Sequence, residues 1–156
     1  MTAFISADGS YRYALTRHVA PLTGEGTCTF VMLNPSTADA STDDPTIRRC
    51  ISFAKRDGFG GMRVANLYAF RAAQPRDMFR AIDPIGALND HYLNFSAAST
   101  VIAAWGTHAR PNRVRDVMRL LHDRTVLCLG TTKDASPRHP LYVRADQPFI
   151  PFEAAP

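Results

Sequence analysis

A chain of 156 residues with 46% hydrophobic and 21% charged residues has the size and composition of one globular domain, expected to span residues 1–156. It lacks the apolar run of ~18 residues that a membrane helix needs and the basic start of a signal peptide, so we expect a cytoplasmic protein without a membrane partner. The formal net charge of +4 rests mainly on arginines, because Lys55 and Lys133 are the only lysines. This bias is compatible with a nucleic-acid partner, since the planar guanidinium matches phosphate.

Hydrophobic patterning predicts two strands and a helix at the start of the chain. Residues 11–17 alternate as an edge strand would, and residues 28–33 form an apolar run typical of a buried strand. A polar loop then leads to an Asp-Pro pair that can cap a helix, and apolar residues at helical spacing follow it. We therefore expect a helix over residues 45–57.

The same reasoning extends to the rest of the chain. Apolar runs predict three further buried strands, at residues 62–70, 100–105 and 125–129, and a last strand is compatible with residues 147–152. The helices expected between and around them are at 75–82, at 88–98 and at the amphipathic stretch of Val114, Val117, Met118 and Leu121.

This alternation predicts an α/β fold, a three-layer α/β/α sandwich around a central, mostly parallel sheet of four to five strands. In such sheets, functional residues gather at the carboxyl ends of the strands. Four sequence features fall at those ends: Asn34-Pro35-Ser36, Asn66 to Phe70, Trp105-Gly106 and Arg138-His139-Pro140.

Two of these residues carry chemistry that can be argued from type alone. Asn34 precedes a rigid proline, so its amide can be held toward a pocket, although an Asn-Pro pair also serves as an ordinary turn. His139 lies in a loop with no helical or strand period, where it is either a surface histidine or a donor that stabilises developing negative charge. Both alternatives stay open for each residue.

The cysteines do not suggest a metal or cluster site. Cys28, Cys50 and Cys128 are an odd number at wide spacing, without the CxxC pairs of zinc sites. We expect buried, reduced thiols, no metal and no cofactor.

The order of the motifs is informative. The series VMLNPS, VANLYAF, VIAAWGTHA and RHPLYV resembles, in the same order, the motifs of the uracil-DNA-glycosylase superfamily. The whole chain is also similar to the bacterial and phage domain-of-unknown-function family numbered 1643, through RYALTR, FVMLNPSTADASTDDPTIRRC, GFGGMRVANLYAFRA, NDHYL, AWG and PRHPLYV. That second family brings no established activity.

The glycosylase resemblance implies roles for the strand-end residues. It implies that Asn34 orients the attacking water, Asn66 hydrogen-bonds the edge of an extruded base and His139 stabilises charge on the departing base. The further substrate-binding residues expected are Pro35, Ser36 and Trp105 around the pocket, Tyr68 or Phe70 stacking on the base, and Arg71 and Arg138 contacting phosphate.

The chain also departs from that pattern. The water-binding motif lacks its usual glycine, and the histidine motif reads His-Pro-Leu-Tyr, with Leu141 or Tyr142 as a loose counterpart of the inserted wedge. Uracil specificity is therefore not predicted.

The acidic residues have structural interpretations. For Asp39, Asp43 and Asp44 we favour helix capping and loop solvation; beside a phosphate backbone they would have to face away or pair with Arg48 and Arg49. Asp90 is interpreted as an early-helix acid favoured by the helix dipole.

These observations lead to one hypothesis and two alternatives. The first is an N-glycosidic-bond hydrolase acting on a modified or damaged base in nucleic acid, which requires Asn34, Asn66 and His139 to lie within a side chain's reach of one another. The alternatives are a catalytically inert nucleic-acid or nucleotide-binding module and an enzyme acting on free nucleosides or nucleotides. The expected partner is thus DNA or a nucleotide; the sequence indicates no oligomeric state.

Overall fold

The computed structural model describes residues 2–19, 24–36, 43–96 and 98–154, the side chains of residues 95 and 96 excepted. Its strands are β1 (Thr2–Ile5), β2 (Arg12–His18), β3 (Thr27–Met32), β4 (Gly61–Asn66), β5 (Thr100–Ala103), β6 (Thr125–Cys128) and β7 (Ile150–Pro151). The helices of these residues are α1 (Pro45–Arg56), α2 (Pro75–Phe79), α3 (Asn89–Ser96), α4 (Pro111–Leu120) and the 3-10 helix η1 (Pro140–Tyr142). The α/β class expected from the sequence is confirmed.

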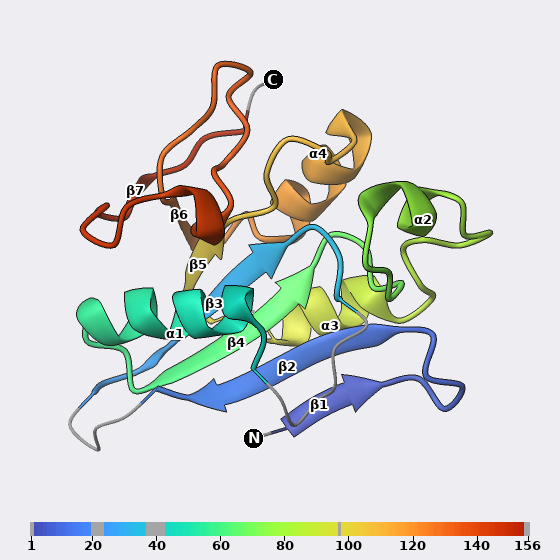
Figure 1. The fold of residues 1–156 in the computed structure, drawn as a ribbon, viewed down its shortest axis with the longest axis horizontal. Coiled ribbons are helices and arrows are strands. Elements are labelled where there is room, and N and C mark those ends of the chain that lie inside the picture. The colour runs from blue at the N-terminus through green and yellow to red at the C-terminus, as the bar shows by residue number, and fades with distance from the viewer. Residues whose placement is uncertain (1, 20–23, 37–42, 97, 155–156) are drawn as a thin grey trace.

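The strands form one mixed sheet of seven strands, in the order β1-β2-β4-β3-β5-β6-β7 (Figure 1). The central strands β4, β3, β5 and β6 are parallel, as the alternation of strands and helices predicted. The flanking strands β1, β2 and β7 pair antiparallel. The expectation of four to five mostly parallel strands was therefore wrong, because short antiparallel strands extend the sheet at both edges.

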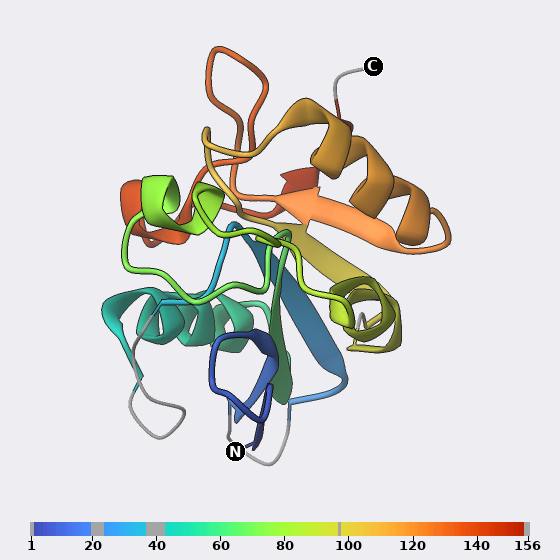
Figure 2. The same ribbon diagram turned by 90° about the vertical axis from the view of Figure 1, so that its right-hand side faces the viewer.

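Helices cover both faces of the sheet (Figure 2). One buried cluster joins α1 to one face, through residues such as Cys50 and Phe53. The other cluster joins α3 and α4 to the opposite face, through Leu93 and Val117. Successive residues of β3 enter opposite clusters, as Phe30 and Val31 do, so this strand is buried on both faces.

Helix α1 begins as its sequence predicts. The side chain of Asp44 accepts a hydrogen bond from the backbone N–H of Ile47 at 2.8 Å, and Pro45 occupies the first turn. Apolar residues at helical spacing bury one face of α1 against the sheet. This fixes the beginning of α1 beside the carboxyl ends of the central strands, where it meets the cavity described next.

Several boundaries differ from the expectations. The strand predicted over residues 62–70 leaves the β4 ladder after Asn66, and Ala69 N–H then bonds to the carbonyl of Ile85. The helices predicted at 75–82 and 88–98 are shorter, and the last strand comprises only Ile150–Pro151. Strand β1 was not predicted, because four residues with no clear alternation carry too weak a pattern.

Candidate functional site

The carboxyl ends of the central strands and the beginning of α1 surround a cavity of about 520 Å³. Its volume lies within the usual range of small-molecule sites, ~300–1,000 Å³. Six residues nominated from the sequence line it: Asn34, Ser36, Asn66, Trp105, Arg138 and His139. Asn34, Asn66 and His139, which the leading hypothesis requires to be close, thus share one cavity.

Asn34 follows β3, and the backbone fixes its amide. Its Nδ2 donates to the carbonyl of Ala72 at 2.9 Å and to that of Pro35 at 3.1 Å. The two donor hydrogens are thereby engaged, so the oxygen Oδ1 is the part of the amide that can accept a hydrogen bond from a water or a ligand. Asn34 combines both interpretations left open by the sequence: it stabilises its turn, and it presents an acceptor at the cavity.

Asn66 is the last residue of β4 and is only 2% exposed. It lines the cavity, and its side-chain amide forms no hydrogen bond with any residue that the structure describes. The amide atoms of Asn66 are not fully enclosed by the protein, so they reach the space of the cavity and can bond to what enters it. A buried amide of this kind at a cavity wall is therefore a strong candidate for ligand recognition.

The position of Asn66 is maintained from the opposite face of the sheet. Asn89 of α3 is fully buried, and its Nδ2 donates to the backbone carbonyls of Asn66 and Leu67, each at 3.0 Å. Arg113 of α4 donates through Nε to the same Leu67 carbonyl at 2.7 Å. The backbone carbonyls of Asn66 and Leu67, at the end of β4, therefore each accept a side-chain hydrogen bond from α3 or α4.

His139 is half-buried and precedes η1. Its Nδ1 accepts a hydrogen bond from the backbone N–H of Leu141 at 3.3 Å. The proton of a neutral imidazole must then be on Nε2, which becomes a donor. Burial lowers the pKa of His139, and the charge of Asp44 acts in the opposite direction. The neutral Nε2–H form is the one that this environment favours.

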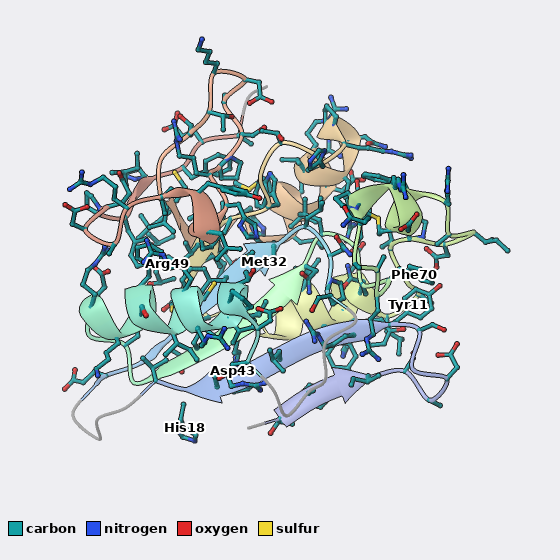
Figure 3. All side chains as sticks on the ribbon, in the orientation of Figure 1. Tyr11, His18, Met32, Asp43, Arg49 and Phe70 are labelled. Carbon is teal, nitrogen blue, oxygen red and sulfur yellow. The ribbon has the colours of Figure 1, made fainter. Side chains whose placement is uncertain are left out.

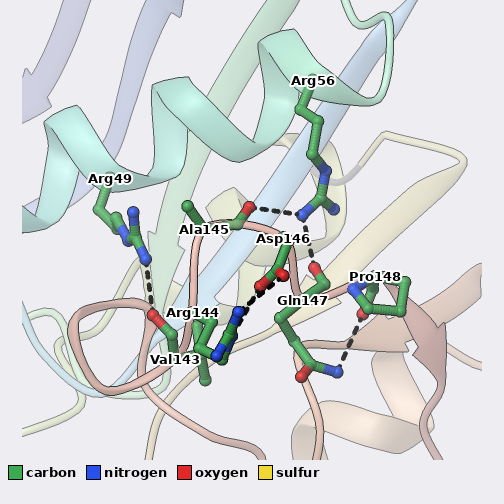
Figure 4. Close-up of polar contacts among 8 residues, drawn as sticks. All are labelled: Arg49, Arg56, Val143, Arg144, Ala145, Asp146, Gln147 and Pro148. Carbon is green, nitrogen blue, oxygen red and sulfur yellow. Dashed lines mark hydrogen bonds and ion pairs between the residues drawn. The ribbon is translucent and has the colours of Figure 1, made fainter.

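Helix α1 holds the loop that carries His139 (Figure 4). Arg49 donates to the carbonyl of Val143 at 2.6 Å and to that of Pro140 at 3.3 Å. About two turns further on, Arg56 donates to the carbonyls of Ala145 and Gln147. The segment that follows His139 is therefore hydrogen-bonded to α1, which packs on the sheet.

Trp105 and Gly106 follow β5. Trp105 is 3% exposed, lines the cavity and packs edge to face on Phe152, with ring centroids 5.4 Å apart. Gly106 has a φ of +72°, a conformation that other residues rarely adopt, and its N–H donates to the carbonyl of Pro137. This bond joins the end of β5 to the segment that leads to His139.

Four nominated residues do not line the cavity: Pro35, Tyr68, Phe70 and Arg71. Tyr68 is buried in the core against Phe79 of α2, and its hydroxyl accepts the N–H of Arg110. Phe70 packs on Tyr11, and Figure 3 shows this pair at the right of the molecule, apart from Met32 at the cavity. Stacking of a base on Tyr68 or Phe70 is therefore not supported.

The other two residues have backbone partners. Pro35 is buried, and its carbonyl accepts the N–H of Ala72, which closes the turn after β3. Arg71 donates to the carbonyl of Gly9 at 3.0 Å. Arg138 does line the cavity; it is exposed, and its Nε donates to the carbonyl of Thr131.

The cavity also contains residues that were not nominated. The most consequential is Arg12 of β2, which is 5% exposed. The other polar ones are Asp44, Thr46, Gln74, Thr107, His108, Thr132 and Tyr142. Tyr142, considered only as a wedge, is 79% exposed beside the His139 ring. The sequence did not predict Arg12 as a cavity residue, because the alternating pattern of its strand does not distinguish one arginine from another.

The acids of the loop before α1 have structural partners. Asp44 accepts the N–H of Ile47 and, at 3.2 Å, the hydroxyl of Ser36, so the capping interpretation is confirmed. Asp43 forms an ion pair with Arg17 at 2.7 Å, and its backbone carbonyl accepts a hydrogen bond from Arg48. Asp39 lies outside the described residues.

Asp90 and the cysteines are structural as well. Asp90 forms an ion pair with Arg113 at 2.6 Å. The three cysteines are buried and free, and burial raises the pKa of Cys28 to about 12 and also raises those of Cys50 and Cys128. Protonated, inaccessible thiols are poor nucleophiles. Among the residues that the structure describes, no group of three or more His, Cys, Asp or Glu side chains could hold a metal ion.

The structure is an α/β protein with a mixed sheet and a cavity, lined by both polar and apolar residues, at the ends of its central strands. The chain belongs to the family described as protein of unknown function DUF1643, whose model matches residues 12–141. No curated protein and no solved structure gives a significant match to it. The resemblance to uracil-DNA glycosylases has no support from these comparisons and stays a hypothesis. No helix in the described ranges is long and apolar enough to cross a membrane.

Proposed function

We propose that the protein is an N-glycosidic-bond hydrolase that recognises a modified or damaged nucleobase in its cavity. The observation that carries the proposal is the buried Asn66 amide, which lacks a partner among the described residues and shares a cavity with Asn34 and His139. An amide offers one donor and one acceptor side by side, as the edge of a base requires. The helices on both faces of the sheet and the order of the motifs support a glycosidase-like three-layer architecture.

The chemistry follows from the atoms that face the cavity. Oδ1 of Asn34 would accept a hydrogen bond from the attacking water and orient it toward the sugar carbon C1′. The bond from C1′ to the base nitrogen breaks, and its electron pair leaves with the base, while the water oxygen bonds to C1′. The proton that the water loses ends on the base, so the reaction is a hydrolysis with balanced atoms and charge.

His139 would act on the leaving group. Because its Nδ1 is occupied by the Leu141 N–H, its Nε2–H is the donor available to a base acceptor that gains negative charge. A preorganised donor of this kind contributes roughly 3 kcal/mol to lowering a barrier. Asn66 would hold the base edge while the bond breaks.

The test is a base-release assay with purified protein. Substrates are single- and double-stranded oligonucleotides, free nucleosides and nucleotides that carry uracil, deaminated or hypermodified bases. We expect release by the wild type, a loss of at least about 100-fold in Asn34→Ala and a loss of roughly 10²–10³ in His139→Gln. Asn94→Ala, an exposed asparagine on α3, is the matched control and should keep wild-type activity. Equal activity of Asn34→Ala and wild type would refute the proposed role of Asn34.

A specific observation favours a second candidate, an inert base-binding module. Asp44 is the only acid among the described residues at the cavity, and both of its carboxylate oxygens accept hydrogen bonds from the chain. Asn34 is not a base, so water activation would depend on orientation alone. This candidate predicts binding of nucleosides or nucleotides with no base release from any substrate, and binding that Asn34→Ala does not abolish.

A further inference from the structure

Strand β2 contains an irregularity that determines where its first residue points. Phe4 of β1 pairs with Ala14. The next residue, Ile5, pairs with Arg12, so Tyr13 is an extra residue in β2. Such a bulge interrupts the alternation of side chains between the two faces of a sheet, and bulges of this kind are frequent beside functional sites.

The contacts on either side of the bulge show its effect. Leu15 belongs to the buried cluster on the α1 face of the sheet. Strict alternation would place Tyr13 on that face and Arg12 on the other. Tyr13 instead stacks on Tyr92 of α3, with ring centroids 5.1 Å apart and planes at 8°. Arg12 lines the cavity together with Asn66.

Arg12 is a buried cation near charges of both signs. It is 5% exposed; burial, and secondarily the charge of Arg71, lower the pKa of Arg12, while the charge of Asp44 raises it. A guanidinium keeps its proton in proteins and binds phosphate through two parallel N–H groups. A buried arginine in the wall of a cavity is therefore suited to an anionic group of a ligand that enters the cavity.

We propose that the ligand is a free mononucleotide, with its phosphate bound by Arg12 and its base recognised by Asn66. This proposal rests on the base recognition proposed above and narrows the substrate class. A terminal phosphate monoester is a compact group with about two negative charges, and it can follow its nucleoside into the cavity. The phosphodiester backbone of a strand passes along the surface, where the exposed Arg138 rather than Arg12 would meet it.

The experiment compares nucleosides with their 5′-monophosphates by calorimetry at constant ionic strength. The panel comprises adenosine, guanosine, cytidine, uridine, thymidine and the deaminated and hypermodified nucleosides of the base-release assay. Inorganic phosphate and an eight-nucleotide oligothymidine are measured beside them. For the base that binds best, we expect the monophosphate to bind at least tenfold more tightly than the nucleoside. Arg12→Gln should lower the affinity for the monophosphate to that for the nucleoside and leave the affinity for the nucleoside unchanged. Arg12→Lys, which keeps the charge without the two-pronged geometry, should give an intermediate loss.

Arg119→Gln is the matched control, because Arg119 is an exposed arginine of α4 outside the cavity, and it should bind like the wild type. Equal binding of nucleoside and monophosphate by the wild type would overturn the proposal without any variant, so poor folding of Arg12→Gln cannot conceal a failure. Binding of the oligonucleotide alone, with steep salt dependence, would overturn it in favour of a strand. Tight monophosphate binding without base release would support it and refute hydrolysis, whereas binding of inorganic phosphate as tightly as of any monophosphate would refute base recognition.

Discussion

The backbone N–H of Leu141 donates to Nδ1 of His139 across 3.3 Å, and this contact determines the protonation of the ring. Nδ1 can accept only when it carries no proton, so the neutral Nε2–H tautomer is expected. Nitrogen-15 NMR of histidine-labelled protein distinguishes the two tautomers directly. A ring protonated on Nδ1 at neutral pH would contradict the donor role assigned to Nε2.

The same ring should make stability depend on pH. Burial lowers the pKa of folded His139 below its ordinary value of 6.5, so the unfolded chain takes up this proton at a higher pH than the folded chain does. The His139 contribution is therefore complete above about pH 6.5 and is lost as the pH falls toward the folded pKa. Urea unfolding of wild type and His139→Gln at several pH values should show their stability difference shifting against the wild type in acid. A wild-type advantage that grows on acidification would contradict this sign.

Asp44 should contribute to stability as a helix cap. Asp44→Ala removes the acceptor of the Ile47 N–H at the start of α1, and replacing such a cap by alanine costs about 1 kcal/mol. Asp44→Ser restores an acceptor at the same position and should recover most of the loss. Both are measured by urea unfolding. If the serine variant is as unstable as the alanine variant, the carboxylate acts through another contact, such as that with the Ser36 hydroxyl.

Asn89 should be a positioning residue for the site. Asn89→Ala removes the donor that the carbonyls of Asn66 and Leu67 share. Leu67 keeps its bond from Arg113, whereas the Asn66 carbonyl loses this side-chain donor, and an unmet buried hydrogen bond costs about 1–3 kcal/mol. We expect lower stability together with weaker nucleotide binding, and faster amide exchange near the end of β4. Asn94→Ala on the same helix controls for the loss of an exposed asparagine. Loss of stability with unchanged binding would mean that Asn89 supports the fold but not the site.

The site was partly predictable because apolar runs mark where strands end. The runs before Asn34, Asn66 and Trp105 are buried parallel strands, and parallel strands bring their carboxyl ends together. Neighbouring residues were misplaced where the chain leaves the regular ladder. The apolar pattern continues past Asn66 to Phe70, but the regular strand ends at Asn66, so strand alternation no longer predicts the direction of Tyr68, which enters the core and not the cavity.

Arg12 shows a different limit of sequence reasoning. Its orientation depends on the extra residue Tyr13 between β1 and β2, and a bulge is decided by the pairing of two strands and by the packing of Tyr13 on Tyr92. The strand pairing and the ring packing both join residues that are apart in the sequence, so a local pattern does not predict them. The edge strands β1 and β7 were missed or overextended for a related reason, since short antiparallel strands depend on their neighbours more than on their own pattern.

A substitution at Asn66 should change ligand binding without changing the stability of the fold. Its side-chain amide has no hydrogen-bond partner among the described residues, so Asn66→Leu removes no bond that holds the fold. We expect the free energy of unfolding to stay within about 0.5 kcal/mol of the wild type, because the substitution removes no hydrogen bond within the described residues. Nucleoside and nucleotide binding should fall together, since the base contact is lost in both. Urea unfolding and calorimetry on the same preparation test this, and a loss of about 2 kcal/mol in stability would make Asn66 a structural residue and remove the main support for base recognition.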